Sequence, residues 1–418
     1  MPPWQTAHSG KWCPRAFSSS FQQNESMHAG LIYLGRTNWR DQDRPFGMWP
    51  DDRLAHLYVV GKTGSGKSSF LEFLIRQDLV NSNGLALFDP HGDLVERVHQ
   101  FAVAKGRKDV VYLNVPDLTQ SFGFNPLSNV PLSRRSLAAA GLIEAFKKMF
   151  SDSWGVKLEH FFRHALLLLL DQPSATLADV PRLFLDAQFR EQAAQHATLD
   201  QVRRFWTFEF PSYPPRFRTE AIAPIMNKVG AFLADPFLAR ILATPKSTFD
   251  LREIMDEGRV LLVNLAKGKI GEGPAALFGA LMMSSLSLAG LSRSDAPEEK
   301  RSDFFIYGDE FQTYTTLAVA NMAAELRKYG VGMILANQYL DQLEQEVKSA
   351  ILGNIGSLVV FRVGANDAGA LCKEFGDNFE MQDLIALPNR SFFVRMLVRG
   401  QYVDPFSAKT IEVPPPMA

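Results

Sequence analysis

The apolar residues of the chain occur in short runs that alternate with helical patterns, both before residue 130 and after residue 250. Short apolar runs bounded by glycine or acidic residues are typical of buried strands. Strands that alternate with helices indicate a mostly parallel sheet with helices on both faces. We therefore expect an α/β fold, with strands near 30–35, 54–60, 84–89, 109–114, 259–266, 303–310, 331–338 and 356–363.

Between residues 131 and 250 the alternation stops. Helical patterns such as RRSLAAAGLIEAFKKMF and LEHFFRHALLLLLD follow one another there, with interruptions such as FPSYPPRF. We interpret this segment as an all-α insert in the α/β core. The predicted division is an N-terminal arm with a short strand (1–50), the first part of the core (51–130), the insert (131–250) and the second part of the core (251–418).

The two ends of the chain differ in character. Residues 1–30 are polar and have no period, so we expect a loosely ordered arm. Residues 391–406, SFFVRMLVRGQYVDPF, alternate between apolar and polar positions, which predicts a pair of edge strands. No apolar run reaches the ~20 residues of a membrane helix, and the N-terminus lacks the apolar core of a signal peptide. These observations predict a cytoplasmic protein without membrane insertion of its own.

Composition adds little beyond these limits. The net charge of the 418 residues is −1, so no global field attracts nucleic acid, and a contact with DNA would need a local patch or an assembled pore. The two cysteines, Cys13 and Cys372, are far apart, and metal sites need clustered ligands. We interpret both as idle thiols, which fits a reducing compartment.

A glycine-rich turn between a predicted strand and a predicted helix carries the clearest chemistry. It matches the pattern G-x-x-x-x-G-K-[ST] in full. Backbone N–H groups of such a turn point at phosphates, Lys67 reaches the β- and γ-phosphates, and the hydroxyl of Ser68 binds Mg²⁺. The nucleotide-binding residues are therefore Gly61, Lys62, Thr63, Gly64, Ser65, Gly66, Lys67, Ser68 and Ser69.

Acidic residues at the ends of two predicted strands compete as the second anchor for Mg²⁺. Asp309 ends one strand and is followed by Glu310, which can orient and deprotonate the attacking water. Asp89 ends another strand without such a neighbour, so we interpret it as a loop residue that shapes the site. Gln338 ends the following strand, where ligands of open α/β sheets bind, and is expected to sense the γ-phosphate or the water.

Three classes of protein share such a turn. A GTPase would also need an Asn-Lys-x-Asp base reader, and the near match NKVG has Gly230 in place of the aspartate. The Asp-Glu pair far downstream favours a motor ATPase over a small-molecule kinase. Composition does not separate a motor that moves nucleic acid from one that moves or remodels protein.

Several further motifs make the chain resemble the FtsK–HerA superfamily, and more narrowly the conjugative coupling proteins of the TraD/TraG type, from about residue 30 to the end. The stretches that carry the resemblance are RPFGMWPDDRLAHLYVVGKTGSGKSSFL, LALFDPHGDL, FGFNPL, LLVNLAKGKIGE, DEFQTYTT, ELRKYGVGMILANQYLDQL, ILGNIGSLVVFRVGANDA and DPFSAKT.

The resemblance implies a RecA-like P-loop NTPase core and a ring, expected to be a hexamer, that binds ATP and Mg²⁺ at each subunit interface and passes DNA through its centre. It also implies an arginine from the neighbouring subunit. Arg327 matches that arginine by its position after the Asp-Glu pair, and Arg362 is a second candidate. Lys267 and Lys269 lie in a glycine-rich segment after a core strand and are candidates for contact with a phosphate, either of DNA or of a neighbour's nucleotide.

We therefore expect an ATP-driven DNA translocase that accepts single- or double-stranded DNA with little sequence preference. Membrane-bound coupling proteins carry N-terminal membrane helices, which this sequence lacks. Its partners are accordingly expected to be a separate membrane, relaxosome or defence protein. The alternative is a P-loop ATPase that moves or remodels protein in a secretion or defence assembly.

Overall fold

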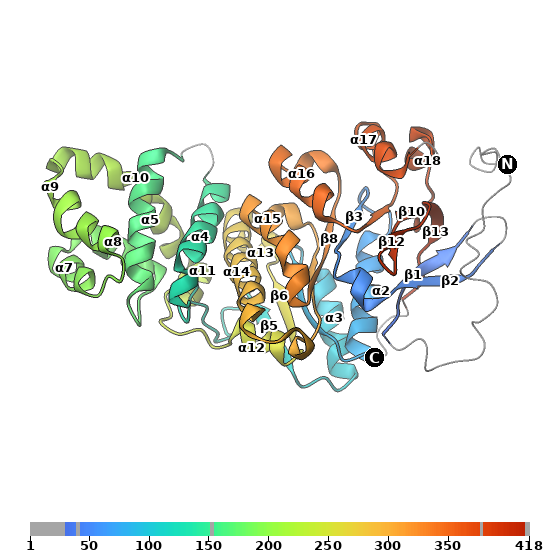
Figure 1. The fold of residues 1–418 in the computed structure, drawn as a ribbon, viewed down its shortest axis with the longest axis horizontal. Helices are drawn as coiled ribbons and strands as arrows, with labels where there is room; N and C mark the ends of the chain where they lie inside the picture. Colours follow the sequence, from blue (N-terminus) through green and yellow to red (C-terminus); the bar gives the residue numbers. More distant parts are fainter. Residues whose placement is uncertain (1–29, 39–41, 151–153, 377–378, 414–418) are drawn as a thin grey trace.

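A mixed sheet of eleven strands runs through the middle of the molecule (Figure 1). The computed structural model describes residues 30–38, 42–150, 154–376 and 379–413; Cys13 and nearly all of the predicted arm lie outside these residues. The strands are β1 (Ile32–Thr37), β2 (Pro45–Met48), β3 (Leu57–Val60), β4 (Gly84–Asp89), β5 (Val110–Asn114), β6 (Val260–Asn264), β7 (Phe304–Gly308), β8 (Val331–Asn337), β9 (Ser357–Val360), β10 (Ser391–Arg395), β11 (Leu397–Val398), β12 (Gln401–Tyr402) and β13 (Phe406–Lys409).

The order of the strands is β2-β1-β13-β10-β9-β3-β8-β7-β4-β6-β5, and β11 pairs only with β12. The stretch from β9 to β5 is parallel throughout, whereas β10, β13, β1 and β2 add antiparallel pairs. This arrangement confirms the α/β class and the mostly parallel sheet. The expectation of a pair of edge strands at residues 391–406 was right only in part. β11 and β12 form a two-stranded pair outside the large sheet, whereas β10 and β13 lie inside it, because β1 and β2 extend the sheet beyond β13 and make β2 its edge.

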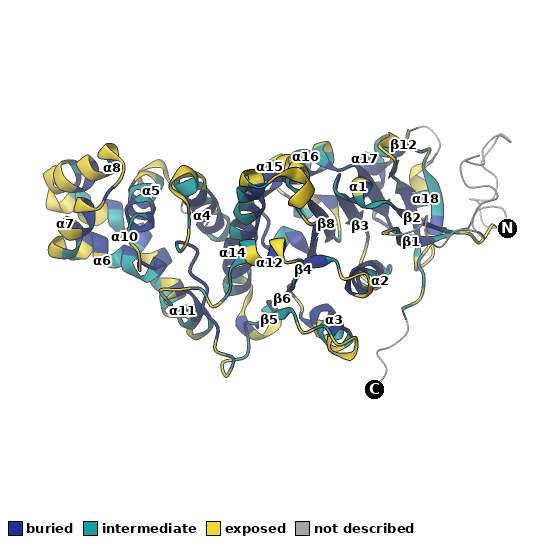
Figure 2. Cartoon of the chain, turned by 60° about the horizontal axis from the view of Figure 1, so that its bottom comes forward, coloured by how far each residue is buried: buried dark blue, intermediate teal, exposed yellow. Residues whose placement is uncertain are grey.

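Helices cover both faces of the sheet (Figure 2). Along β4 the side chains alternate: Leu85 and Leu87 pack with α2 (Lys67–Val80) and α3 (Asp93–Ala104), whereas Ala86 and Phe88 join the core on the opposite face. That opposite core is formed with α12 (Leu251–Asp256), α14 (Glu272–Ser292), α15 (Leu317–Leu326), α16 (Gln345–Asn354) and α17 (Ala365–Phe375). Both faces of the central strands are therefore buried, which explains their nearly continuous apolar sequences.

In residues 131–250, the described part of the segment between β5 and β6 consists of helices joined by turns and loops, and it extends away from the sheet (Figure 1). At Gly141 a Cβ would lie 2.1 Å from Ser284 Oγ, so α4 approaches α14 closely at this point. The helical insert that was predicted is present, and it packs on the core through α14. Its helices are α4 (Arg135–Met149), α5 (Val156–Leu170), α6 (Val180–Leu185), α7 (Ala187–Gln195), α8 (Asp200–Arg204), α9 (Phe210–Ser212), α10 (Pro215–Leu233) and α11 (Pro236–Leu242).

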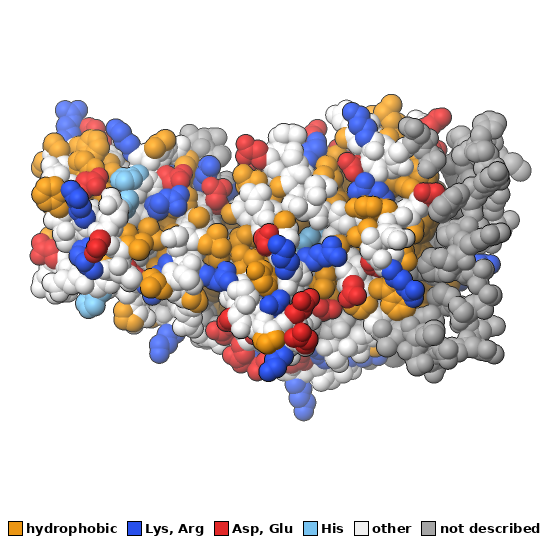
Figure 3. Space-filling view, in the orientation of Figure 1, with side chains coloured by type: hydrophobic (Ala, Val, Ile, Leu, Met, Phe, Trp, Pro, Cys, Tyr) orange, Lys and Arg blue, Asp and Glu red, His pale blue; other side chains and the backbone are white. Residues whose placement is uncertain are grey.

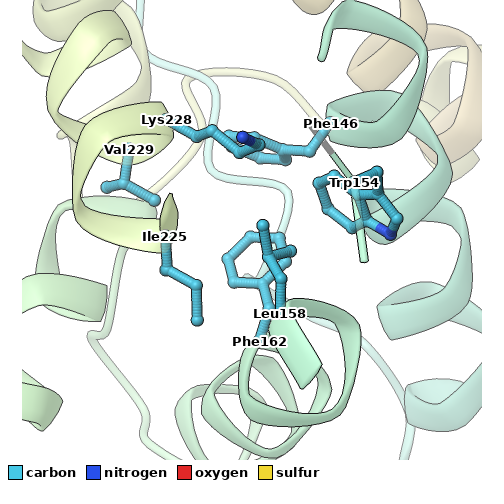
Figure 4. A pocket seen from close by; sticks show the side chains of 7 residues that line it. All are labelled: Phe146, Trp154, Leu158, Phe162, Ile225, Lys228 and Val229. Atoms are coloured by element: carbon cyan, nitrogen blue, oxygen red, sulfur yellow. The ribbon is translucent and has the colours of Figure 1, made fainter. Parts of the chain in front are cut away.

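A small hollow lies between α4, α5 and α10 (Figure 4). Its lining is apolar apart from one lysine, so it lacks the converging polar groups of a phosphate site. The lining residues are Phe146, Trp154, Leu158, Phe162, Ile225, Lys228 and Val229.

One helical stretch of the described chain, Glu272–Asp295, is long and apolar enough to cross a membrane by length and composition. Its mean hydropathy is 1.6, and 78% of its apolar window is buried inside the protein. The expectation that no stretch reaches this length was wrong. Glycine and serine residues interrupt the apolar pattern of α14, but Gly279, Ser284, Ser287 and Gly290 are buried in the helix together with most of its leucines.

Candidate nucleotide site

The glycine-rich turn lies at the carboxyl end of β3, in the centre of the eleven-stranded sheet, and leads directly into α2 at Lys67. Gly64 and Gly66 have φ angles of 75° and 119°, a region that glycine adopts without strain. At Gly61 a Cβ would lie 2.5 Å from the Cβ of Phe361, so a side chain there would displace the neighbouring strand end. The sequence pattern is therefore met by the strand, turn and helix that a phosphate-binding loop requires.

The side chain of Lys67 is buried inside this loop. Its Nζ donates to the carbonyl of Gly61 and, at 3.2 Å, to the carbonyl of Lys62. Burial lowers the pKa of Lys67, and the carboxylates of Asp309 and Glu310 oppose this effect. The ammonium group is thus held against the carbonyls at the start of the loop.

Ser68, at the start of α2, contacts Asp309, which follows β7. Ser68 Oγ donates to Asp309 Oδ2 at 3.2 Å, and Asp309 directly follows β7. Burial, together with the charges of Asp89 and Glu310, raises the pKa of Asp309 from 3.8 to about 6. A hydroxyl beside a carboxylate that lacks a strong cationic partner is the ligand pair that Mg²⁺ takes in P-loop sites.

Glu310 has an unusual backbone conformation and several partners. Its φ of 42° lies in the left-handed region, and its N–H donates to Asp309 Oδ1 at 3.0 Å. Lys267 Nζ lies 3.1 Å and His91 Nε2 lies 3.0 Å from Glu310 Oε2, and the amide of Gln338 donates to Oε1. Burial alone would raise the pKa of Glu310, but the hydrogen bonds from His91, Lys267 and Gln338 outweigh it and lower the pKa.

Gln338 connects the glycine-rich loop with the acidic pair. It directly follows β8, which lies between β3 and β7 in the sheet. Thr63 Oγ1 donates to Gln338 Oε1 at 2.8 Å, and the amide nitrogen of Gln338 donates to Glu310. The same side chain therefore contacts both the loop and the residue predicted to activate water.

Asp89 has a different environment, although it ends the adjacent strand β4. Its carboxylate accepts hydrogen bonds from the backbone N–H groups of His91 (2.9 Å), Leu94 (2.8 Å) and Val95 (3.0 Å). These bonds satisfy the first amides of α3 and fix the loop that carries His91. The geometry supports the interpretation of Asp89 as a residue that shapes the site.

The two candidate phosphate-binding lysines, Lys267 and Lys269, lie on the single turn of α13 (Lys267–Ile270) but face different surroundings. Lys267 points to the nucleotide site through its contact with Glu310, and its side chain is 26% exposed. Lys269 is exposed and has no side-chain partner among the described residues. The structure therefore brings Lys267 to the nucleotide site and leaves Lys269 at the surface.

The two candidate arginines lie at opposite ends of the parallel strands: one at their carboxyl ends, where the loop lies, and the other at their amino ends. Arg362 follows β9 at the carboxyl edge, and its carbonyl accepts the N–H of Lys62 at 2.8 Å, beside the loop of the same chain. Arg327 is exposed and precedes β8 at the amino edge. The seven residues of β8 span about 20 Å between its two ends, so Arg327 does not reach the loop of its own chain.

A family model for the type IV secretion-system coupling protein DNA-binding domain matches residues 47–383. This chain belongs to that family. Among curated proteins, the coupling-protein domain is similar to the type 4 coupling protein DotL of Legionella pneumophila, with 20% identity over 412 residues. The match covers 85% of this chain and 51% of DotL, so the chain spans about half the length of that relative.

Solved structures confirm the RecA-type fold of this coupling-protein domain. The bacterial conjugative coupling protein TrwB matches with a TM-score of 0.61 and 18% identity over 87% of this chain and 86% of TrwB. VirB4 of Thermoanaerobacter pseudethanolicus matches with a TM-score of 0.60 and 15% identity over 92% and 96% of the two chains. Another TrwB structure that matches with the same TM-score is a complex with ADP and Mg²⁺.

Sequence reasoning missed two residues beside the site. His91 contacts Glu310, and its position two residues after a strand-end aspartate was an available signal. Arg390 donates its backbone N–H to the carbonyl of Ser65 at 2.8 Å and has a φ of 65°. It lies in the turn before β10, and only the pairing of β10 with β9 brings that turn to the loop, so no local pattern signalled it.

Proposed function

We propose that this coupling-protein domain hydrolyses ATP at the interfaces of a ring, expected to be a hexamer in the cytoplasm, and uses the energy to move DNA. The observation that carries the proposal is the arrangement at the carboxyl edge of the sheet. The glycine-rich loop with Ser68, the residue Gln338 and the Asp309–Glu310 pair follow the three adjacent strands β3, β8 and β7. Hydrogen bonds join Ser68 to Asp309, Thr63 to Gln338, and Gln338 to Glu310. Membership of the coupling-protein family supports DNA as the substrate that is moved.

The residues of the loop fit a Mg²⁺–nucleotide. The loop runs from Gly61 to Ser69, and its glycines allow the backbone amides to turn toward phosphate. Among the described residues, the hydrogen bonds of the Lys67 ammonium go to carbonyl groups, and no ion pair holds it, which leaves its charge available for the β- and γ-phosphates. Ser68 and Asp309 would hold the metal, which supplies positive charge to the transferring phosphoryl group.

The hydrolytic step needs a base and a group that orients the attacking water. Hydrogen bonds hold the pKa of Glu310 below its ordinary range, so this carboxylate is ionised at neutral pH and can accept a proton. Gln338 contacts both Glu310 and Thr63 and is placed to orient the water against the γ-phosphate. The two side chains therefore divide activation and orientation between them.

The position of Arg327 supports the proposal that a neighbouring subunit completes the site. Its exposed guanidinium lies at the edge of the sheet opposite its own loop, so the nucleotide that it can contact belongs to another subunit. Positive charge from that subunit would stabilise the charge of the transferring phosphoryl group. Arg362, beside the loop of its own chain, is the less suitable candidate for this role.

The chain gives DNA no broad electrostatic attraction. On the face in Figure 3, basic and acidic side chains are mixed over much of the surface, and acidic ones gather at its lower middle, in line with the net charge of −1. Contact with DNA would therefore use a few lysines and arginines brought together in the ring, among them Lys269. Contacts of this kind recognise the DNA backbone and carry little sequence preference.

The test combines particle mass with the rate of ATP hydrolysis. Mass is measured with a non-hydrolysable ATP analogue, with and without DNA, and the rate is measured without DNA and with single- or double-stranded DNA. We expect a ring and a rate that rises with DNA; Lys67→Ala should abolish turnover, and Glu310→Gln should bind ATP but hydrolyse it about 10²–10⁴-fold more slowly. A monomer that turns over at full rate, or a ring indifferent to both DNA forms, would overturn the proposal; the second result would favour a protein substrate.

A further inference from the structure

Lys267 connects the nucleotide site with the surface. Its ammonium lies 3.1 Å from Glu310 Oε2, and three quarters of its side chain is covered. Lys269, two residues later on the same helical turn, is exposed and has no side-chain partner in the described parts of the chain. A polyanion that binds at Lys269 therefore comes close to the cation that pairs with Glu310.

The turn that carries these lysines is bounded by two residues with positive φ. Ala266, which precedes α13, has a φ of 31°, and Gly271, which follows it, has a φ of 95°. The N–H of Lys267 donates to the carbonyl of Pro90 at 2.7 Å, which joins α13 to the loop of His91. A non-glycine residue held in a sparsely populated conformation is a feature of segments that change state. A single helical turn between two such residues can move without unfolding β6 or α14.

In the observed arrangement, the protein groups that contact Glu310 oppose efficient catalysis. The carboxylate of Glu310 accepts hydrogen bonds from Lys267, His91 and Gln338, so its lone pairs are engaged by protein groups. A carboxylate paired with cations is a weaker base than a free one, and an engaged oxygen is less able to bind the attacking water. Of the three partners, Lys267 is the one whose backbone lies on a turn with an exposed lysine.

We propose that Lys267 is a positioning residue that restrains Glu310, and that the phosphates of bound DNA draw Lys267 away and so accelerate hydrolysis. This inference rests on the proposed function and adds to it the means by which DNA reaches the hydrolytic residue. The ammonium group exchanges a carboxylate oxygen for a phosphate oxygen, so its charge stays paired in both states. His91 and Gln338 remain beside Glu310 and keep it in the site.

The test compares Lys267→Met with Lys267→Arg and with Lys108→Met. Lys108 is exposed and precedes β5 at the amino edge of the sheet, away from the nucleotide site, and so provides a matched loss of charge. For each protein, kcat and KM for ATP are measured without DNA and with saturating DNA, and thermal unfolding confirms that the variant is folded.

We expect Lys267→Met to raise the DNA-free kcat on the order of threefold to tenfold, because the variant removes one partly screened ion pair from the general base. The ratio of kcat with DNA to kcat without DNA should fall close to one. Lys267→Arg should keep the restraint, and Lys108→Met should behave as the parent protein. Lys269→Met should increase the DNA concentration needed for half-maximal stimulation. The nucleotide's own phosphate could also draw Lys267 away from Glu310. An ATP titration without DNA separates that effect from the effect of DNA.

Two results would overturn the inference while leaving the proposed function intact. The first is a parent protein stimulated by DNA together with a Lys267→Met variant that keeps the same ratio of stimulation. The second is a fall of the DNA-free kcat in Lys267→Met to the level of Glu310→Gln, which would make Lys267 a support of the reaction. A parent protein indifferent to DNA would overturn the inference and the proposed function together.

Discussion

Replacement of Asp309 by asparagine should make the isolated protein more stable at neutral pH while it removes metal-dependent activity. The carboxylate is 5% exposed and lies near the carboxylates of Asp89 and Glu310, so its charge is costly in the folded state. Its pKa is about 6 in place of 3.8. A shift of about 2 units corresponds to about 3 kcal/mol of free energy of unfolding.

The pH at which the charge of Asp309 lowers stability follows from the direction of its pKa shift, which is upward. The folded protein holds the proton of Asp309 more tightly than the unfolded chain does, so the charged carboxylate costs no stability below about pH 4. The cost grows as the pH rises through the folded pKa of about 6 and is complete above it. Asparagine keeps the shape and an oxygen that accepts the N–H of Glu310, so we expect a gain of about 1–3 kcal/mol at pH 8 and little gain at pH 4.

The assay is urea-induced unfolding of the parent protein and Asp309→Asn at pH 4 and pH 8, in chelator and without nucleotide. Asp89→Asn is the matched control, because it removes a charge from the same region but weakens the cap of α3, and it should lower stability by about 1 kcal/mol. When Mg²⁺ and nucleotide are added, the parent protein should become more stable than Asp309→Asn, since ligand binding stabilises the parent protein. A variant less stable than the parent at pH 8, or an equal gain at both pH values, would refute the reasoning.

Three further predictions concern the core, the loop and the interface. His56 is buried with a pKa of about 4, because burial opposes its charge, so stability present above pH 6.5 should fall by about 3 kcal/mol toward pH 4, and His56→Gln should lose that dependence in unfolding experiments. Gly61→Ala should abolish nucleotide binding in equilibrium titrations, because its Cβ would lie 2.5 Å from the Cβ of Phe361; unaltered affinity would contradict the loop geometry. Arg327→Ala and Lys67→Ala should each be inactive alone but regain part of the activity when mixed, and mixtures that stay inactive would count against an arginine supplied by the neighbour.

The parts of the fold and site that the sequence predicted depend on patterns within one continuous stretch of chain. The strand, turn and helix around Gly61–Ser68 follow from apolar residues, glycines and a helical period within one short stretch, and the structure contains all three. Asp309 and Glu310 follow an apolar strand, so their place at the carboxyl edge was predictable from sheet geometry. The helical insert was predictable because its pattern differs from that of the core over more than a hundred residues.

The parts that escaped prediction depend on contacts between distant segments. The contacts of Glu310 with Lys267 and His91 arise because β4 lies between β6 and β7 in the sheet, an order that periodicity does not reveal. The position of Arg390 depends on β10 pairing with β9. The membrane-like length of α14 was overlooked because its glycines and serines break the apolar run, although the helix is continuous.

The central claim is that ATP hydrolysis between subunits moves DNA, and displacement of a blocking group from DNA tests it most directly. The substrates are a duplex that carries a triplex-forming oligonucleotide and a single strand that carries a biotin–streptavidin block. The account predicts that ATP drives release from at least one substrate with the parent protein, and that Glu310→Gln binds DNA and ATP but releases nothing. Rapid ATP hydrolysis without release from either substrate would contradict the account.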